Sequence, residues 1–303
     1  MTNFVMPRYP VYIPSKGRAI ATQQLTIKML TRDHVPFKLV VEPQELDIYS
    51  QTFNIPKHEI LTLPESGQGL IYVRNWIKQH STAAGDERHW QLDDNMRDMY
   101  RVYGKKRLYC TAGVALRTCE DFVDRYSNVA IAGLNYYMFG FTGKDMPPFY
   151  VNVHVYSCTL VNNAIPHHWR SVYNDDTDIC LQVLADGWCT VLINAFLVDK
   201  ETTMTVKGGN TDELYGGDGR LKMARSLERL WPGVVETKRR FGRPQHVIKD
   251  AWRRFDTPLK LKPGIDLTTI PPNDYGLKLK QVGDEIKSPD LKKLYDEANK
   301  DQS

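Results

Sequence analysis

Residues His89-Trp90-Gln91-Leu92-Asp93-Asp94-Asn95 form an apolar-flanked run that ends abruptly in two carboxylates and an amide. Such a cluster at a strand end is costly to bury unless a cation or a hydrogen-bonded ligand compensates it. Hard oxygen ligands of this kind suit Mg²⁺ or Mn²⁺, so Asp94, Asp93 and Asn95 are candidate metal ligands. The alternative interpretation is a helix N-cap or an Asx turn, where Asp and Asn are equally at home.

The acidic cluster closes the last of four β-rich runs that alternate with helical patterns. We predict strands at 9–14, 37–41, 59–63 and 90–92, with helices at 19–34 and 70–80. This alternation predicts a parallel α/β sheet, in which ligands bind at the carboxyl ends of the strands. The polar turns at Ser15 and Glu42 and the acidic cluster all fall at such ends, which predicts a site there.

The middle of the chain adds strands at 129–134, 150–161 and 189–198. The acidic run Asn174-Asp175-Asp176-Thr177-Asp178 precedes a helical pattern. Capping of that helix explains at least one of these acids without any function. The glycine-rich stretch 207–219 is interpreted either as a lid that orders over substrate or as a plain surface loop.

Charge is unevenly distributed along the 303 residues. The chain has a formal net charge of +4, but residues 217–262 hold 13 Lys or Arg and 5 Asp or Glu, a net +8, which leaves −4 for the rest. A basic segment on a mildly acidic body suggests a polyanionic partner such as nucleic acid, although many charge runs are only solvated helix faces.

Several protein classes are disfavoured by the bulk sequence. No apolar run approaches the roughly 18 residues that span a bilayer, and the N-terminus carries no secretory pattern. The five cysteines form no CxxC pair, which favours reduced thiols and a cytoplasmic setting over a zinc site.

Taken in order, the motifs resemble those of GT-A-fold nucleotide-sugar glycosyltransferases over about residues 9–200. The matching segments are Ile13-Pro14-Ser15-Lys16-Gly17-Arg18, Val73-Arg74-Asn75-Trp76, Asp93-Asp94-Asn95 and Asp175-Asp176-Thr177-Asp178. The combination of PSKGRA, VVEP, RNW and HWQLDDN is similar, more narrowly, to the TET/JBP-associated glycosyltransferases of bacteriophages. Asn95 replaces the second Asp of the usual DxD motif. An amide oxygen can still bind a hard cation but carries one negative charge less, so the metal assignment is weaker.

The resemblance implies a role for each matching residue. It implies a Mn²⁺- or Mg²⁺-dependent transfer from a UDP-sugar to a hydroxymethylated pyrimidine, 5-hydroxymethylcytosine, in DNA, with inversion if a single carboxylate acts as base. The base would be Asp176, with Asp175 and Asp178 as the next candidates. Residues expected to bind the donor are Pro14, Ser15, Lys16, Arg18, Glu42, Arg74, Asn75, Asp93 and Lys207. Residues expected to contact DNA are Arg239, Arg240, Arg243, Arg253 and Arg254. Arg74 has a structural alternative, a helix Arg paired with an acid, and Lys16 has one as a solvated turn residue.

We therefore expect a GT-A-type, mostly parallel α/β domain at 1–215 and a basic helical extension at 216–303 that packs on it and contacts DNA. Two other functions stay open at this point. A sugar-1-phosphate nucleotidyltransferase would use a similar sheet and a carboxylate-held Mg²⁺, and a DNA-binding module would have lost its catalysis. We expect no membrane partner, and a cytoplasmic location, in the host if the chain is phage-encoded.

Overall fold

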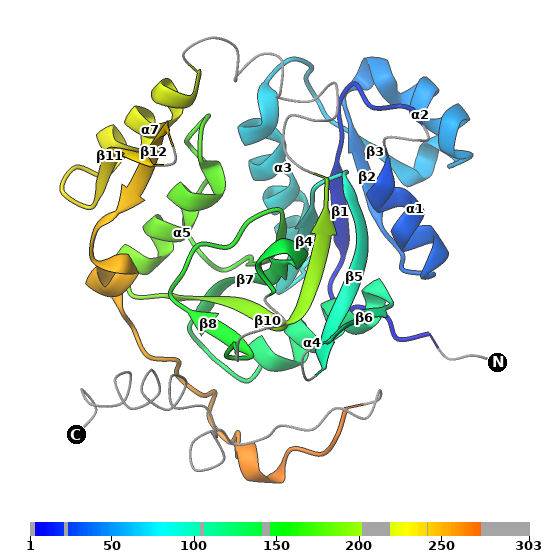
Figure 1. Ribbon diagram of the computed structural model, residues 1–303. Coiled ribbons are helices and arrows are strands. Elements are labelled where there is room, and N and C mark those ends of the chain that lie inside the picture. Colours follow the sequence, from blue (N-terminus) through cyan, green and yellow to red (C-terminus); the bar gives the residue numbers. More distant parts are fainter. Residues whose placement is uncertain are drawn as a thin grey trace.

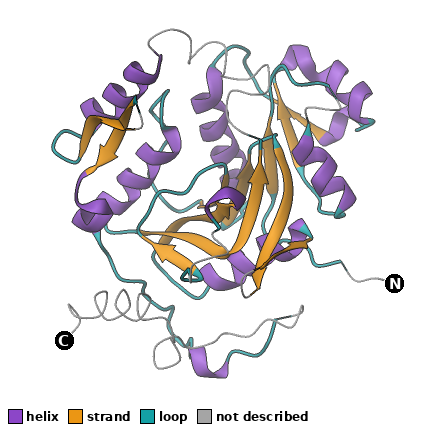
Figure 2. Cartoon of the chain, in the orientation of Figure 1, coloured by secondary structure: helices purple, strands orange, loops and turns teal. Residues whose placement is uncertain are grey.

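The computed structural model describes residues 4–20, 24–103, 106–140, 146–201, 219–240 and 242–273. Its centre is one ten-stranded sheet with helices on both sides (Figure 1, Figure 2). The strand order is β3-β2-β1-β4-β9-β7-β10-β5-β6, and β8 pairs with β10. The strands of this sheet are β1 (Val11–Pro14), β2 (Lys38–Val41), β3 (Ile60–Thr62), β4 (Arg88–Leu92), β5 (Met96–Tyr103), β6 (Lys106–Cys110), β7 (Val129–Tyr136), β8 (Phe149–Val151), β9 (Cys158–Asn162) and β10 (Cys189–Lys200).

The sheet is mixed, and seven of its ten strands point the same way, in agreement with the mostly parallel sheet that the alternating pattern predicted. Strands β1 to β4 pair in parallel, as do β7 and β10, while β9 runs antiparallel between β4 and β7. The single strand predicted at 150–161 is divided into β8 and β9. Between them Asn152 and Ser157 adopt left-handed backbone conformations, with φ of 60° and 65°, which no regular strand allows.

Helices cover the two faces of the sheet because side chains alternate along each strand. On one face, Val11 and Ile13 join a core that includes residues of α1 and α4, and on the other Tyr12 packs with Ile77 of α3. Helix α5 packs through Ile179 and its neighbours onto the sheet in a further cluster. The helices are α1 (Leu25–Arg32), α2 (Leu46–Phe53), α3 (Gly69–Ala83), α4 (Ala112–Val123), α5 (Asp175–Ala185) and α7 (Gly219–Leu230). Within the described ranges, every helix is too short or too polar to span a bilayer.

The basic C-terminal part is only partly helical, which corrects the prediction of a helical extension. Helix α7 is followed by a hairpin of β11 (Val235–Arg240) and β12 (Arg243–Ile248), which form a separate two-stranded sheet. Leu227, Val234 and Val235 pack against Leu181 of α5, so this part lies on the body of the molecule. The boundary predicted at residue 215 lies outside the described residues and stays a prediction.

Candidate functional site

The two adjacent carboxylates that follow β4, those of Asp93 and Asp94, lie on opposite faces of the sheet. Trp90 and Leu92 belong to the core on the α1 side, whereas His89 and Gln91 lie under α3 and bond with one another there. Asp93 continues the strand ladder by donating its backbone N–H to the Ser157 carbonyl at 2.9 Å. Since side chains alternate, Asp93 follows the His89 face and Asp94 follows the Trp90 face.

Asp94 lies in a buried polar network that closes the turn after β1. Its carboxylate accepts hydrogen bonds from Ser15 Oγ at 2.7 Å and from Gln24 Nε2 at 3.4 Å, and it forms an ion pair with Arg18. Tyr49 shares a 2.7 Å hydrogen bond with Ser15. Burial raises the pKa of Asp94, against the opposing effects of Arg18 and Ser15. These contacts hold the β1 turn against the end of β4.

Asp93 faces two cations on the other side of the strand. Lys200, the last residue of β10, donates from Nζ to Asp93 Oδ2 at 2.6 Å, and Arg74 Nη2 lies 3.6 Å from Asp93 Oδ1. Burial acts to raise the pKa of Asp93, but Lys200 and Arg74 outweigh it and the pKa is lowered. Asp93 is therefore a charged carboxylate held between two basic side chains.

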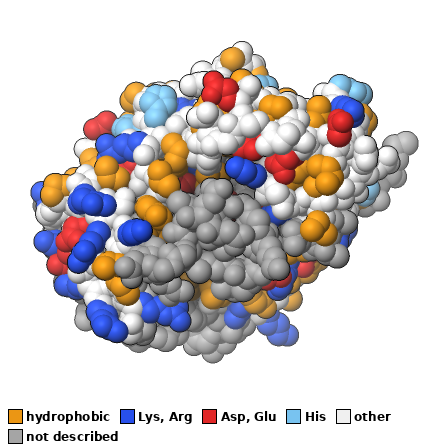
Figure 3. All heavy atoms as spheres, turned by 90° about the horizontal axis from the view of Figure 1, so that it is seen from above, with side chains coloured by type: hydrophobic (Ala, Val, Ile, Leu, Met, Phe, Trp, Pro, Cys, Tyr) orange, Lys and Arg blue, Asp and Glu red, His pale blue; other side chains and the backbone are white. Residues whose placement is uncertain are grey.

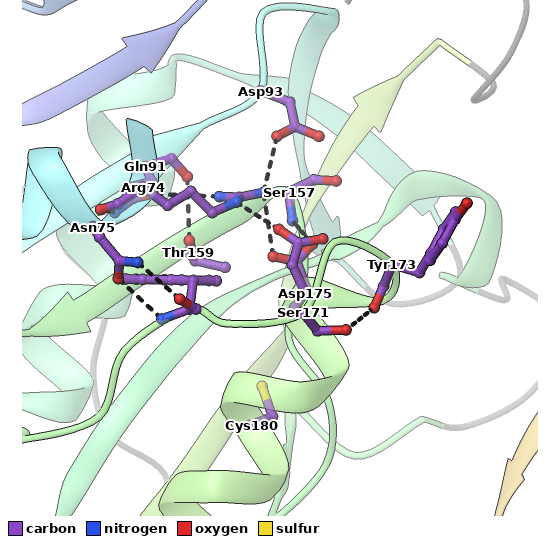
Figure 4. Close-up of polar contacts among 12 residues, drawn as sticks. Arg74, Asn75, Gln91, Asp93, Ser157, Thr159, Ser171, Tyr173, Asp175 and Cys180 are labelled. Carbon is purple, nitrogen blue, oxygen red and sulfur yellow. Dashed lines mark hydrogen bonds and ion pairs between the residues drawn. The ribbon is translucent and has the colours of Figure 1, made fainter. Parts of the chain in front are cut away.

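Arg74 of α3 is the centre of the site (Figure 4). Its Nε lies 2.7 Å from Asp175 Oδ2 and its Nη2 lies 3.3 Å from Asp176 Oδ1, although the Nε contact lacks the angle of a hydrogen bond. Burial opposes the charge of Arg74, but Asp176, Asp175 and Asp93 together raise its pKa. Arg74 is buried and paired with acids, as its structural interpretation expects, and its donor-binding role stays a prediction.

A chain of buried hydrogen bonds supports Arg74 from below. Arg74 Nη1 donates to Gln91 Oε1 at 3.2 Å, and Gln91 Nε2 lies 2.9 Å from His89 Nε2. His89 Nδ1 lies 2.6 Å from Asn163 Oδ1, and since that oxygen only accepts, His89 carries its proton on Nδ1. The polar residues of β4 are therefore internal supports for the site.

Asp176 lies at the start of α5 with Arg74 on one side and Ser157 on the other. Its Oδ2 accepts the Ser157 backbone N–H at 3.4 Å. Burial raises the pKa of Asp176 to about 7, opposed by Arg74 and assisted by Asp175 and Asp93. A carboxylate that titrates near neutrality suits a general base.

Asp178 is placed away from this cluster, although it is only two residues further on. Its carboxylate accepts two hydrogen bonds from Arg170, one from Trp231 and one from Gln182, at 2.7–3.1 Å. Its contacts tie α5 to α7 and to the preceding loop. The structure therefore brings Asp175 and Asp176, but not Asp178, to Arg74.

Three residues of the site were missed by the sequence analysis: Ser157, Lys200 and Tyr136. Ser157 Oγ accepts from Lys200 Nζ at 2.8 Å and lies 2.6 Å from Tyr136 Oη. Lys200 and Tyr136 end strands β10 and β7, so the carboxyl-end rule would have found them had those strand ends been predicted correctly. No sequence signal marks Ser157, because its position depends on a left-handed turn before an antiparallel strand.

The residues predicted to hold the nucleoside line the ends of β1 and β2. Pro14 ends β1, and Lys16 forms a 3.3 Å ion pair with Glu42, which follows β2. Glu42 also accepts the Gly67 N–H at 2.8 Å. Although burial alone would raise the pKa of Glu42, Gly67, Gln44 and Lys16 lower it. Their donor-binding roles stay predictions.

The side-chain amide of Asn75 is hydrogen-bonded to the backbone of Trp169. It accepts the Trp169 N–H at 3.0 Å and donates to the Trp169 carbonyl at 2.8 Å, so both ends of its amide hold one backbone unit (Figure 4). Lys207, the remaining residue of the predicted donor set, lies outside the described residues.

The predicted DNA-binding arginines lie on the hairpin and just after it. Arg239, Arg243, Arg253 and Arg254 are exposed, while the side chain of Arg240 lies outside the described part. Figure 3 shows basic side chains gathered on the side of the molecule where Figure 1 places α7, β11 and β12. This distribution is a cationic surface of the kind that a polyanion favours.

The fit of the site to a divalent cation is incomplete. Among the described residues, no group of three or more His, Cys, Asp or Glu side chains is arranged to hold an ion. Asp94 is paired with Arg18 and Asp93 with Lys200. Asn95 has a buried Oδ1 without a hydrogen-bond partner, but the other two predicted ligands are occupied by cations. As arranged, these side chains do not form an ion cage.

Comparisons with solved structures give distant matches. S. aureus TarS matches with a TM-score of 0.39 at 13% identity, covering 73% of this chain and 65% of its own. A protein described as a nucleotide-diphospho-sugar transferase from Desulfovibrio desulfuricans matches with a TM-score of 0.36 at 10% identity, covering 62% of this chain and 80% of its own. A mannose-1-phosphate geranyltransferase from Thermus thermophilus matches with a TM-score of 0.30 at 14% identity, covering 76% of this chain and 65% of its own.

The comparison with curated proteins found no match. One protein family, described as TET-Associated Glycosyltransferase, matches residues 9–209, about two thirds of the sequence. The matched range contains the β1 turn, Arg74, the Asp93-Asp94-Asn95 cluster and the acids of α5. The chain belongs to the TET-associated glycosyltransferase family.

Proposed function

We propose that this glycosyltransferase moves a sugar from a UDP-sugar to the hydroxyl of a hydroxymethylated pyrimidine, 5-hydroxymethylcytosine, in DNA. The observation that carries the proposal is the convergence of Asp176 with Arg74, Asp93 and Lys200 at the carboxyl edge of the sheet. It joins a carboxylate with a pKa of about 7 to two cations in one small site. The family membership supports the sugar transfer, and the exposed arginines support the DNA acceptor.

Asp176 is the proposed base. The acceptor hydroxyl has a high pKa, so its proton must leave as the oxygen attacks the anomeric carbon. Ionised Asp176 takes that proton, the new glycosidic C–O bond forms, and the bond to the diphosphate oxygen breaks. One displacement of this kind inverts the anomeric centre, which makes inversion part of the proposal.

The leaving diphosphate needs positive charge. Lys200 lies at the edge with a side chain 12% exposed, beside Asp93 at 25%, so it is more accessible to a ligand than Arg74 at 3%. We propose that Lys200 contacts the diphosphate directly and that Arg74 stabilises it from behind. Lys16, Arg18 and Glu42 would hold the nucleoside end, because they surround the β1 turn.

A Mn²⁺ or Mg²⁺ ion is a separate part of the proposal, and no step above depends on it. Arg74 and Lys200 face three carboxylates, Asp93, Asp175 and Asp176. The surplus negative charge supports an added cation when a diphosphate arrives. Asp93 and Asn95 are the oxygen ligands it would find, once Asp93 has left Lys200.

The test is transfer to defined DNA. The protein is incubated with UDP-glucose and oligonucleotides that contain cytosine or 5-hydroxymethylcytosine, with Mn²⁺ or with chelator. We expect the hydroxymethylated base to gain the mass of one hexose, while cytosine gains nothing. Transfer to a non-nucleic-acid acceptor alone would refute the DNA proposal, and undiminished transfer in chelator would refute the metal. Proton NMR of the anomeric signal separates inversion from retention.

We propose a cytoplasmic location, because a phage-encoded enzyme would meet its DNA acceptor in the cytoplasm of the host. Fractionation of cells that produce the protein tests it, and recovery in the membrane or external fraction would contradict it.

A further inference from the structure

A row of rings leads away from the acidic cluster toward the start of β10, where the neighbouring Val153 carbonyl accepts from Thr190. The ring centroids of Tyr136 and Tyr156 are 4.6 Å apart, and His154 stacks on Tyr156 at 4.7 Å with an interplanar angle of 26°. Phe139, 41% exposed, lies 6.0 Å from Tyr136. We call Tyr136, Tyr156 and His154 the aromatic row. Its members are half-buried, so each keeps part of its surface at the solvent.

One end of the aromatic row touches the reaction site. Tyr136 Oη lies 2.6 Å from Ser157 Oγ, and the Ser157 backbone N–H donates to Asp176. Tyr156 directly precedes Ser157, and burial followed by the charge of Asp176 raises the pKa of Tyr156 to about 12. These contacts place the first two rings beside the proposed base.

The other end of the aromatic row reaches the basic hairpin. Burial, and after it the charge of His246 of β12, lowers the pKa of His154 to about 4, so β12 lies within electrostatic range of this ring. Strand β12 begins at Arg243, which pairs across the hairpin with Arg240. Arg239 and Arg243 are exposed on this same hairpin.

An extruded base fits this geometry better than a base that stays stacked in a duplex. The acceptor oxygen must come within about 3 Å of its base. The Asp176 side chain is only 18% exposed. A hydroxymethyl group that stays in the groove of a stacked duplex is held away from so deep a carboxylate. An extruded base carries its hydroxyl inward, and such bases are commonly held by aromatic side chains.

We propose that the aromatic row is a stacking subsite for one unpaired pyrimidine of the DNA acceptor, with the flanking phosphates on the hairpin arginines. This inference rests on the proposed DNA acceptor and adds the extruded state of the base and the residues that recognise it. The rings are neutral at physiological pH, which suits an uncharged base, and the charge lies at the outer end, where the backbone would pass.

The uracil of the donor is the competing source of a base for these rings. The strand order separates the two positions, since β4 and β9 lie between β1 and β7. The β1 turn with Ser15 is on one side of Asp93, and Tyr136 is on the other. The acceptor base is therefore the occupant that the topology favours.

The test measures binding, so that it does not depend on turnover. Tyr156→Leu and His154→Leu are compared with wild type for affinity toward a single-stranded 5-hydroxymethylcytosine oligonucleotide and, separately, toward UDP. Loss of a stacked base costs about 1–3 kcal/mol, so we expect DNA affinity to fall about 5- to 150-fold, with UDP affinity unchanged. Tyr156→Phe keeps the ring and should restore binding. Tyr103→Leu is the matched control. Tyr103 is exposed and lies at the end of β5 away from Met96, the residue that pairs with Lys200.

Extrusion has its own readout. A duplex with 2-aminopurine next to the modified cytosine should gain fluorescence when wild type binds, and less when Tyr156→Leu binds. Unchanged DNA affinity in both leucine variants would overturn the subsite, and an equal loss of UDP affinity would assign the rings to the donor. Failure of wild type to glycosylate DNA, with the binding pattern intact, would instead refute the proposed acceptor reaction.

Discussion

Asp176 and Asp178 lie two positions apart in the first turn of α5, and their carboxylates serve different neighbours. Asp176 faces Arg74 of α3, whereas Asp178 faces Arg170 and Trp231. Residues two apart in a helix point in directions far apart around its axis, so one acidic run supplies both a site and a structural anchor. The two roles can be separated by the same substitution at each position.

Asp176→Asn should lower kcat by about 10²- to 10⁴-fold, because it removes the proposed proton acceptor. Its stability at pH 8 should equal or exceed that of wild type, because burial and nearby acids raise the pKa of Asp176 to about 7 and make its ionised form unfavourable. Asp178→Asn should instead destabilise the fold by roughly 1–3 kcal/mol through weakened charge-assisted hydrogen bonds. Urea unfolding and initial rates on both variants check this; a larger kcat loss in Asp178→Asn than in Asp176→Asn would reverse the assignment.

Lys200→Met should weaken UDP binding about 10- to 100-fold. The substitution removes a charged donor from the position beside Asp93, and a hydrogen bond to a charged group contributes about 1.5–3 kcal/mol. Isothermal calorimetry with and without Mn²⁺ measures the change. Lys106→Met, at an exposed lysine of β6, is the control, and equal UDP affinity in Lys200→Met and wild type would exclude a phosphate contact.

The parallel half of the fold could be predicted because local patterns determine it. The predicted strand at 90–92 and helix at 70–80 agree with β4 and α3 within a few residues. The hairpin of β5 and β6, whose strands pair with each other locally, was missed, and its place in the sheet depends on a distant partner: β5 pairs with β10, about a hundred residues later. Such pairing leaves no local periodic signal to read.

The candidate site was only partly predictable for a similar reason. The sequence identified Arg74, Asp93 and Asp176 as members of one edge, and the structure brings them together. It could not reveal that Asp93 and Asp94 diverge, which follows from β4 continuing through Asp93. Nor could it reveal the cations that neutralise each of them, because Lys200 and Arg18 reach the cluster only through tertiary packing.

Ser157 allows a test of backbone conformation at the site. Its φ of 65° costs a residue with a Cβ about 1–2 kcal/mol, a cost that glycine avoids. Ser157→Gly should therefore be more stable than Ser157→Ala by about that amount, while both lose activity with the hydroxyl that contacts Lys200. Ser171 is the control, because it is buried but has no positive φ. Ser171→Ala should be more stable than Ser171→Gly in urea unfolding. Equal stability of Ser157→Gly and Ser157→Ala would argue against the left-handed conformation.

The hairpin arginines predict a change in salt dependence. If Arg239 and Arg243 each contact one DNA phosphate, each serine substitution should reduce the slope of log affinity against log salt by about 0.7–0.9. Affinity should fall similarly for cytosine and 5-hydroxymethylcytosine DNA, because phosphate contacts carry no base information. Fluorescence anisotropy over a salt series measures this, with Lys57→Ser as the exposed control on another part of the surface. A slope that stays at the wild-type value in both variants would place the DNA elsewhere.

His89 predicts how stability changes in acid. Burial, despite the hydrogen bond to Asn163, lowers the pKa of His89 to about 4, while the unfolded chain titrates near 6.5. The unfolded state binds the extra proton first as pH falls, so the contribution is complete above pH 6.5 and is lost progressively toward pH 4. Between pH 6.5 and 5 the loss is about 2 kcal/mol.

Burial raises the pKa of Glu120 to about 7, which changes stability in the opposite direction, so the comparison must be between variants. Urea unfolding at pH 7 and pH 5 should show a smaller acid loss for His89→Gln than for wild type by about 2 kcal/mol, while exposed His34→Gln follows wild type. Identical pH dependence in His89→Gln and wild type would mean that His89 is not held neutral beneath Arg74.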